Sequence, residues 1–267
     1  MSKEQKELSF LQHLEVLRWH LVRAVSSIVI FAVLAFIYKD FVFDKVLLAP
    51  LNPDFPTYRF FCNLSEFLGM GDLLCFGDQK WVLHSFTMSG QFSTHIMTSL
   101  FAGLVVAFPY VFWEIWSFIK PALYSKETKI TRWVVFFTSI LFSIGVLFGY
   151  YLVAPLSVNF LGSYQVNPDV NNTIGLSSFI STITTISFAN GLIFELPMLV
   201  YFLTKIGLLT PEFMKQYRKH AIVLTLILSA IITPPDVTSQ ILVSLPLIIL
   251  YEISIKISSR VLKNQNK

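Results

Sequence analysis

Charged residues are scarce in this sequence. Asp, Glu, Lys and Arg together make up 13% of its 267 residues, whereas hydrophobic residues make up 54%, and the mean hydropathy is +0.65. A soluble globular domain usually has about 25% charged residues, because it must cover its surface with polar groups. This chain cannot do so, which excludes an ordinary water-soluble fold. The sequence therefore predicts an integral membrane protein.

The motifs of the common enzyme classes are also missing. The five histidines show no metal-ligand spacing, and there is no H-E-x-x-H. There is likewise no G-x-S-x-G, no P-loop and no dinucleotide fingerprint. The apolar runs show no evident inverted repeat of the kind common in secondary transporters. We therefore expect no enzyme activity, no metal and no cofactor.

Long apolar runs dominate what is present. A membrane-spanning helix needs about 20 apolar residues, and runs of this kind cover 21–38, 95–119, 133–156 and 176–206. Two shorter runs follow at 221–233 and 237–257. The run at 221–233 makes only about 20 Å of helix, so the turn after it could instead be the tip of a re-entrant hairpin. We expect an all-α membrane protein of about six transmembrane helices, folded as one polytopic domain over residues 1–267.

The positive charges predict the orientation. Sixteen of the 20 Lys and Arg residues lie near the N-terminus, in a connection at 120–132, in the connection before the fifth run, and near the C-terminus. The other four lie in or beside the long segment 39–94. Because cytoplasmic loops carry an excess of Lys and Arg, both termini are predicted to be cytoplasmic and 39–94 to be an external loop. The net charge of +4 reflects this bias, so we expect no nucleic-acid partner. No signal peptide is evident, so we expect the first span to be retained.

The only two cysteines, Cys62 and Cys75, both fall in the predicted external loop. An oxidising compartment permits a disulfide between them, which would add about 2–4 kcal/mol of local stability. Two independent thiols are the alternative.

The cytoplasmic segments combine apolar and charged residues. Residues 1–20 predict an amphipathic interfacial helix, whose charges face water in the simplest interpretation. The connection 120–132 is predicted as a short loop between the second and third spans, because proline interrupts helices and Trp and Tyr prefer the interface. Residues 258–267 are predicted as a cytoplasmic tail. Glu114, about two helical turns before Lys120, is expected to extend toward the interface.

The fourth run is polar along one helical face. Residues at helical spacing on this face are Ser177, Ser181, Thr184, Phe188, Gly191 and Glu195. The run makes about 46 Å of helix, too long for a straight crossing, so we expect a kink at Pro197. A carboxylate at membrane depth usually faces a cavity or a partner. A protonated, structural Glu195 is the alternative.

Four separate motifs, far apart in the chain, carry a resemblance to a known family. They are His13-Leu14-Glu15-Val16-Leu17-Arg18, then Phe118-Ile119-Lys120-Pro121-Ala122-Leu123-Tyr124 followed by Glu127, then Phe194-Glu195-Leu196-Pro197, and finally Thr233-Pro234-Pro235-Asp236-Val237-Thr238-Ser239-Gln240. Together they resemble the TatC family, the multispanning subunit of the twin-arginine protein translocase, and they occur in the family's order over most of the chain. Ala49-Pro50-Leu51 resembles the family's first external loop. The resemblance implies a concave helical bundle in a bacterial-type cytoplasmic (inner) membrane.

The resemblance also implies a function. The chain would be a receptor for twin-arginine signal peptides of folded cargo proteins and a scaffold for TatA- or TatB-type single-span subunits, in export driven by the proton-motive force. The implied signal-peptide-binding residues are Glu127, Glu15, Arg18, Phe118, Pro121 and Leu123. The implied partner or cavity residues are Glu195, Pro197, Pro50, Asp236 and Gln240. Contact with lipid and self-association are expected.

The first motif departs from the family at one position. Aligned with the family, Val16 stands where a glutamate is usual, and Glu15 lies one residue earlier, about 100° around a helix. Either Glu15 takes over through a rotated helix, or Glu127 carries more of the recognition. A different function, a proton-coupled solute carrier with Glu195 as its proton site, is the alternative.

Overall fold

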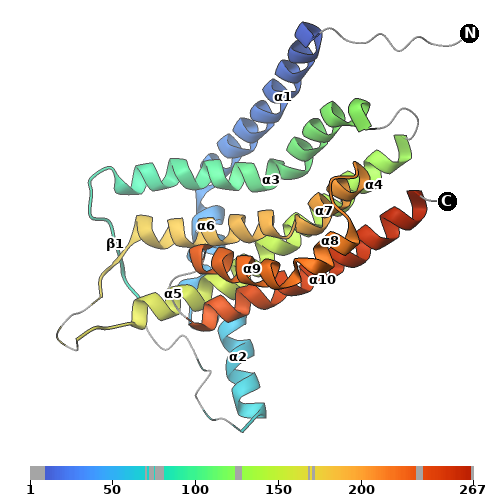
Figure 1. Cartoon of the computed structure of the whole chain (residues 1–267). Coiled ribbons are helices and arrows are strands. Elements are labelled where there is room, and N and C mark those ends of the chain that lie inside the picture. Colours follow the sequence, from blue (N-terminus) through green and yellow to red (C-terminus); the bar gives the residue numbers. More distant parts are fainter. Residues whose placement is uncertain are drawn as a thin grey trace, which may run out of the picture. The chain divides into compact units, whose positions relative to one another are not determined.

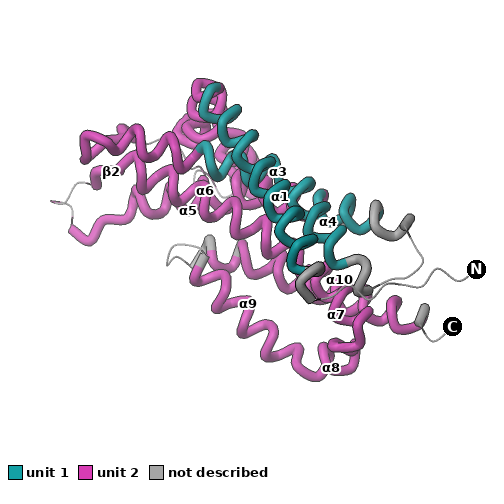
Figure 2. Tube along the Cα trace, turned by 90° about the horizontal axis from the view of Figure 1, so that it is seen from above, with its two compact units in different colours: residues 1–37, 99–139 teal, residues 38–98, 140–267 magenta. Residues whose placement is uncertain are grey.

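The computed structural model describes residues 10–69, 71, 75, 81–123, 128–167, 169, 172–232 and 237–265. Helices dominate this part of the chain, as the sequence predicts. Figure 2 shows two compact units, one formed by Met1–Ile37 with Ser99–Ser139 and the other by Tyr38–Thr98 with Ile140–Lys267. The chain therefore passes through each unit twice.

The first unit contains α1 (Phe10–Ile37), most of α3 (Gly90–Leu123) and the beginning of α4 (Thr128–Phe148) (Figure 1). The predicted interfacial helix leads directly into the first span over its described part, because α1 continues from Phe10 without a break. Within this unit α1 and α3 approach closely at Gly103, where a Cβ atom would lie 2.5 Å from the backbone nitrogen of Ala32. Small residues of this kind let membrane helices pack backbone to backbone.

The second unit holds the later helices. After α4 the chain forms a π-helical turn, Gly149–Val153, and then α5 (Ala154–Ser163). The predicted fourth span is two helices, α6 (Leu176–Ile193) and α7 (Leu196–Lys205), separated by Phe194 and Glu195. The ring of Pro197 excludes a regular helix around the carbonyl four residues earlier, at Ile193. The predicted kink is therefore confirmed.

The C-terminal part contains α8 (Pro211–Gln216), α9 (Arg218–Ile232) and α10 (Val237–Gln265). Helices α7 and α10 pack along each other, and the fully buried Thr204 hydroxyl donates a hydrogen bond to the Ser258 hydroxyl at 2.8 Å. The turn between α9 and α10, at 233–236, lies outside the described residues.

Four helical stretches of the described chain are long and apolar enough to cross a membrane. They are Leu14–Ile37, Gly90–Ile119, Trp133–Ser163 and Leu176–Lys205. They correspond to the first four predicted spans. Helices α9 and α10 occupy the positions of the predicted fifth and sixth spans but are not among these stretches.

The described part of the segment 39–94 is more ordered than a loop. It contains a π-helix (Phe41–Leu47), a 3-10 turn (Ala49–Leu51) and α2 (Pro56–Phe67). The buried Tyr58 hydroxyl donates to the backbone oxygen of Pro50 at 3.0 Å, and burial raises the pKa of Tyr58 to about 12. Leu47 joins a core formed with Val153 and residues of α5, α6 and α10.

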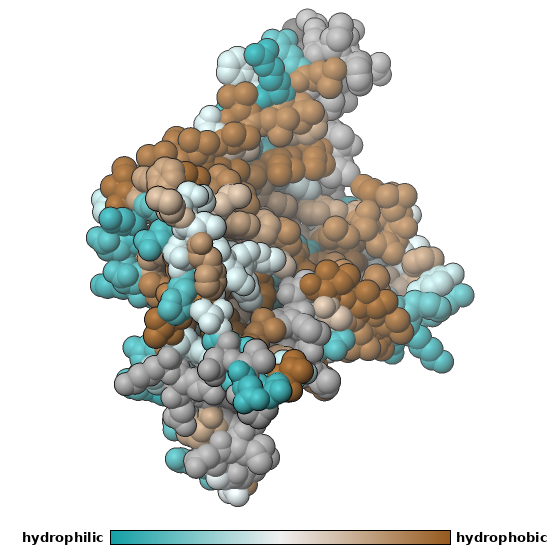
Figure 3. Space-filling view, turned by 90° about the vertical axis from the view of Figure 1, so that its left-hand side faces the viewer, coloured by the Kyte–Doolittle hydropathy of each residue, from teal (hydrophilic) through white to brown (hydrophobic). Residues whose placement is uncertain are grey.

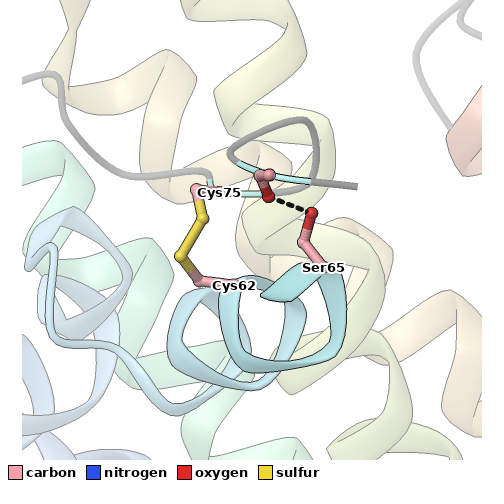
Figure 4. Close-up of a disulfide and its surroundings, with 4 residues drawn as sticks. Cys62, Ser65 and Cys75 are labelled. Atoms are coloured by element: carbon pink, nitrogen blue, oxygen red, sulfur yellow. Dashed lines mark hydrogen bonds between the residues drawn. A yellow bond between two sulfur atoms is a disulfide. The ribbon is translucent and has the colours of Figure 1, made fainter. Parts of the chain in front are cut away.

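Two further links hold this segment in place. Cys62 and Cys75 are joined by a disulfide, and one turn along α2 the Ser65 hydroxyl donates to the backbone oxygen of Gly71 at 2.5 Å (Figure 4). Strand β1 (Leu83–His84) pairs in parallel with β2 (Ile174–Gly175). These two-residue strands connect the segment before α3 to the segment before α6.

Candidate functional site

A buried carboxylate lies between α1 and α3 of the first unit. Glu114 of α3 is only 5% exposed. Its Oε1 accepts a hydrogen bond from the Tyr110 hydroxyl at 2.7 Å, and its Oε2 lies 2.5 Å from Nδ1 of His20. Nη1 of Arg23 lies 3.8 Å from the same Oε2. We call these four residues the Glu114 cluster.

Helix geometry explains how the cluster forms. Tyr110 and Glu114 are four residues apart on α3, and His20 and Arg23 are three apart on α1, so each pair lies on one face of its helix. A buried carboxylate is costly unless it is paired and hydrogen-bonded. The cluster supplies two hydrogen-bond partners and a neighbouring positive charge, which offset that cost.

The prediction that Glu114 extends to the interface is therefore wrong. Its carboxylate turns toward α1 and is held there by His20 and Tyr110. The sequence signal was the occurrence of polar residues at i, i+3 and i, i+4 spacing at the ends of two apolar runs. That signal identifies two polar faces, but it does not say that they meet.

The predicted N-terminal site residues lie on the exposed side of α1. Glu15, Val16 and Arg18 are all exposed, and no ion pair of Glu15 or Arg18 occurs among the described residues. Phe118 of α3 packs against His20 of α1. The two ring centroids lie 6.2 Å apart in an edge-on arrangement. The structure thus brings Phe118 to the Glu114 cluster and leaves Glu15 accessible.

The structure describes several of the predicted site residues only in part or not at all. Glu127 and Asp236 lie outside the described residues. For Pro121 and Leu123 the structure describes only that they belong to the last turn of α3.

Glu195 and Pro197 lie in the second unit, at the break between α6 and α7. The carboxyl group of Glu195 interacts with the backbone of Phe142. Its Oε1 atom is buried and lacks a close hydrogen-bond partner among the described residues, and the same holds for Oδ1 of Asn190 and Oγ of Ser187. A buried polar atom without a partner costs roughly 1–3 kcal/mol. This end of α6 is therefore suited to accept hydrogen bonds from a group that the chain itself does not supply.

The predicted polar face of α6 is not a continuous cavity wall. Gly191 packs so tightly that a Cβ atom there would lie 2.7 Å from Cγ2 of Val146, and the Phe188 ring packs edge-on against that of Phe142. Ser177 and Ser181, by contrast, are exposed. Part of this face therefore packs against a neighbouring helix. Hydrophobic periodicity alone does not distinguish a packed helix face from one that lines a cavity.

The other two predicted partner residues have local roles. Pro50 is fully buried and its carbonyl accepts the Tyr58 hydrogen bond. Gln240 of α10 donates from Nε2 to the backbone oxygen of Leu226 of α9 at 3.3 Å. These contacts fix neighbouring elements of the second unit and do not join Pro50, Gln240 and Glu195 into one cluster.

The surface of the protein is rich in large hydrophobic side chains. On the face shown in Figure 3 hydrophobic residues cover broad areas, and exposed examples on the four candidate spans are Val25, Phe92, Phe137 and Leu192. Soluble monomers seldom expose such continuous apolar areas. Together with the four long apolar helices, this surface is that of a protein embedded in lipid.

Comparisons with known proteins agree with this description. The family model of the Sec-independent protein translocase protein (TatC) matches residues 12–246. A TatC protein of Blattabacterium sp. subsp. Periplaneta americana is 38% identical over 266 residues, covering 99% of this chain and 100% of the relative. A TatC protein of Helicobacter pylori is 44% identical over 166 residues, covering 62% of this chain and 65% of the relative. A crystal structure of the twin arginine translocase receptor TatC superposes with a TM-score of 0.69 at 30% identity, covering 93% of this chain and 99% of the other. The chain therefore belongs to the TatC family and is a multi-pass membrane subunit of the Sec-independent protein translocase.

Proposed function

We propose that this chain is the translocase's receptor for twin-arginine signal peptides and a scaffold for TatA- or TatB-type single-span subunits, in export of folded proteins driven by the proton-motive force. The observation that carries the proposal is the α1–α3 pair. Two membrane helices that pack closely at Gly103 and Ala32 present Glu15 and Phe118 near their charged ends. The solved relative, itself called a receptor, has the same fold over nearly its whole length.

Recognition in this proposal rests on carboxylates. Glu127 and Glu15 accept the arginine side chains, because a carboxylate can accept two parallel hydrogen bonds from a guanidinium group. Glu15 is exposed and makes no ion pair within the described chain, so it is available to a peptide. Arg18, Phe118, Pro121 and Leu123 are proposed to contribute to the same binding surface.

The partner site is proposed at the break between α6 and α7. A polar side chain from a single-span subunit would satisfy the buried Oε1 of Glu195, which lacks a close hydrogen-bond partner among the described residues. Pro197 prevents α6 and α7 from joining into one regular helix. We propose Asp236 and Gln240 as further partner residues on the external side, together with the segment that the buried Pro50 supports, and self-association on the same side.

The proposed topology has six spans, with α9 and α10 as the last two, in the bacterial-type cytoplasmic membrane. Both termini are cytoplasmic, which follows from the distribution of Lys and Arg. The disulfide between Cys62 and Cys75 supports an external position for 39–94, because disulfides persist in oxidising compartments. The whole chain then acts as one polytopic domain.

The comparisons give no support to a proton-coupled solute carrier that uses Glu195. No described feature favours that alternative over a translocase subunit.

Binding of synthetic signal peptides tests the receptor role. The purified chain in detergent is titrated with an Arg-Arg signal peptide and with its Lys-Lys variant, as wild type, Glu127→Ala and Glu15→Ala. Loss of one charge-assisted pair should weaken Arg-Arg binding by about tenfold or more, equivalent to about 1.5–3 kcal/mol. Glu66→Ala, on the exposed face of α2, is the matched control and should bind like wild type. Equal affinity of the wild type for both peptides would exclude the receptor role.

A further inference from the structure

Glu114 is the most deeply buried acidic residue in the part of the chain that the structure describes. Tyr110 and His20 each occupy one of its carboxylate oxygens, at 2.7 and 2.5 Å. Each carboxylate oxygen can accept about two hydrogen bonds. The carboxylate therefore retains acceptor capacity that its two close partners do not use.

Arg23 is the third group beside the Glu114 carboxylate, but it lies farther away than Tyr110 and His20. Its Nη1 lies 3.8 Å from Oε2 of Glu114, which is beyond hydrogen-bond distance. Its side chain is 56% exposed, whereas that of Glu114 is 7% exposed. Arg23 thus neutralises part of the buried charge without forming the bidentate pair that arginine and a carboxylate prefer.

We propose that Glu114 is an arginine-binding carboxylate of the receptor surface, and that Arg23 occupies its binding position until an arginine of a signal peptide displaces it. This inference rests on the proposed function and adds a residue to its recognition site. The exchange replaces one guanidinium by another, so no charge is left buried without a partner, which would be costly.

The position of Glu114 fits this role. It lies one helical turn before Phe118 on α3, and His20 contacts both Glu114 and the Phe118 ring. On α1, Glu15 precedes His20 by five residues, about 7.5 Å of helix. These five residues also turn the helix by about 140°, so Glu15 lies on another face of α1 than His20, and a peptide arginine at Glu114 would leave the second arginine for a different carboxylate.

Arginine suits this position better than lysine. The planar guanidinium donates two parallel hydrogen bonds and is more weakly hydrated than an ammonium group, so it loses less on entering a buried site. We therefore expect Glu114 to contribute to discrimination between Arg-Arg and Lys-Lys peptides, and not only to affinity.

Competition between Arg23 and the peptide provides the test. Fluorescently labelled Arg-Arg and Lys-Lys signal peptides are titrated against the full chain in detergent, as wild type, Arg23→Gln, Glu114→Gln and the double variant. Because removal of an internal competitor raises the fraction of binding-competent protein, Arg23→Gln should tighten Arg-Arg binding by about threefold or more. Glu114→Gln should weaken it by roughly tenfold and reduce the preference over Lys-Lys, since a charged partner is lost. In the double variant the gain from Arg23→Gln should disappear.

The controls separate this role from a structural one. Arg218 and Glu252 form an ion pair at 2.8 Å within the second unit, so Arg218→Gln and Glu252→Gln are matched changes that should leave peptide affinity unchanged. If the wild type prefers Arg-Arg but Arg23→Gln binds it equally or more weakly, the inference is wrong and the Glu114 cluster only packs α1 against α3. This outcome is decisive even if Glu114→Gln does not fold. If the wild type shows no preference between the peptides, the proposed function itself fails.

Discussion

Gly103 of α3 and Ala32 of α1 are in backbone contact within the first unit. A Cβ atom at Gly103 would lie 2.5 Å from the Ala32 nitrogen and 2.8 Å from its Cα and Cβ atoms. No side chain fits between the helices at this point. The close approach fixes the distance between α1 and α3, and therefore the geometry of the Glu114 cluster farther along the same pair.

Substitution of Gly103 by leucine should disrupt this packing. The added side chain forces α1 and α3 apart, and overpacking of this kind typically costs about 1–3 kcal/mol. We expect a lower thermal unfolding midpoint in detergent and weaker Arg-Arg peptide binding. Val106→Leu is the control, because Val106 lies on the same helix but is 58% exposed. Equal stability of both variants would show that the contact is not needed.

Tyr58 should make the protein sensitive to alkaline pH. In the unfolded chain a tyrosine loses its proton near pH 10, whereas burial raises the pKa of Tyr58 to about 12 in the fold. Between these values the unfolded state binds fewer protons than the folded state, so the free energy of unfolding falls as the pH rises. Unfolding midpoints measured from about pH 9 to about pH 12 should fall more steeply for the wild type than for Tyr58→Phe. Identical slopes would contradict the assignment.

The disulfide should stabilise the segment 39–94. Replacing Cys62 and Cys75 together by serine should cost about 2–4 kcal/mol, because the bond closes a loop in the unfolded chain. The expected result is earlier proteolysis of this segment and a mobility shift of the wild type on reduction in denaturing gels. A wild-type protein whose two thiols react with a maleimide without prior reduction would show that the bond is absent.

The buried hydrogen bond between Thr204 and Ser258 should couple α7 to α10. A double-mutant cycle with Thr204→Val and Ser258→Ala should give an interaction free energy of about 0.6 kcal/mol, the average for such bonds between membrane helices. The cycle is measured by unfolding in mixed micelles. Strict additivity of the two single changes would mean that the bond contributes nothing to the association of these helices.

The lengths of the hydrophobic runs and the position of Pro197 predicted much of this fold. The four runs that begin near residues 21, 95, 133 and 176 are the four long apolar helical stretches of the structure, because a lipid-crossing segment must satisfy its backbone hydrogen bonds internally. The kink before Pro197 follows from local stereochemistry. These features depend on neighbours in sequence, and so a single sequence shows them.

Other features depend on which elements meet. The helical order of 39–94 was not predicted, because α2 is short and is held by tertiary contacts such as the hydrogen bond from Tyr58 to Pro50. The burial of Glu114 was not predicted either, since its partner His20 is 94 residues away in the sequence. Periodicity identifies a polar residue on a helix face, but only the packing of α1 against α3 determines what it contacts.

Photo-crosslinking from Phe118 is the most direct test of the receptor role. A photoreactive phenylalanine analogue replaces Phe118 in inverted inner-membrane vesicles, and an Arg-Arg signal-bearing cargo or its Lys-Lys variant is added before irradiation. The same analogue at Phe60, on the exposed face of α2, is the control. We predict a cargo adduct only from position 118 and only with the Arg-Arg signal. Adducts of equal yield with both signals, or an adduct from Phe60 alone, would contradict recognition of the arginine pair at the α1–α3 ends.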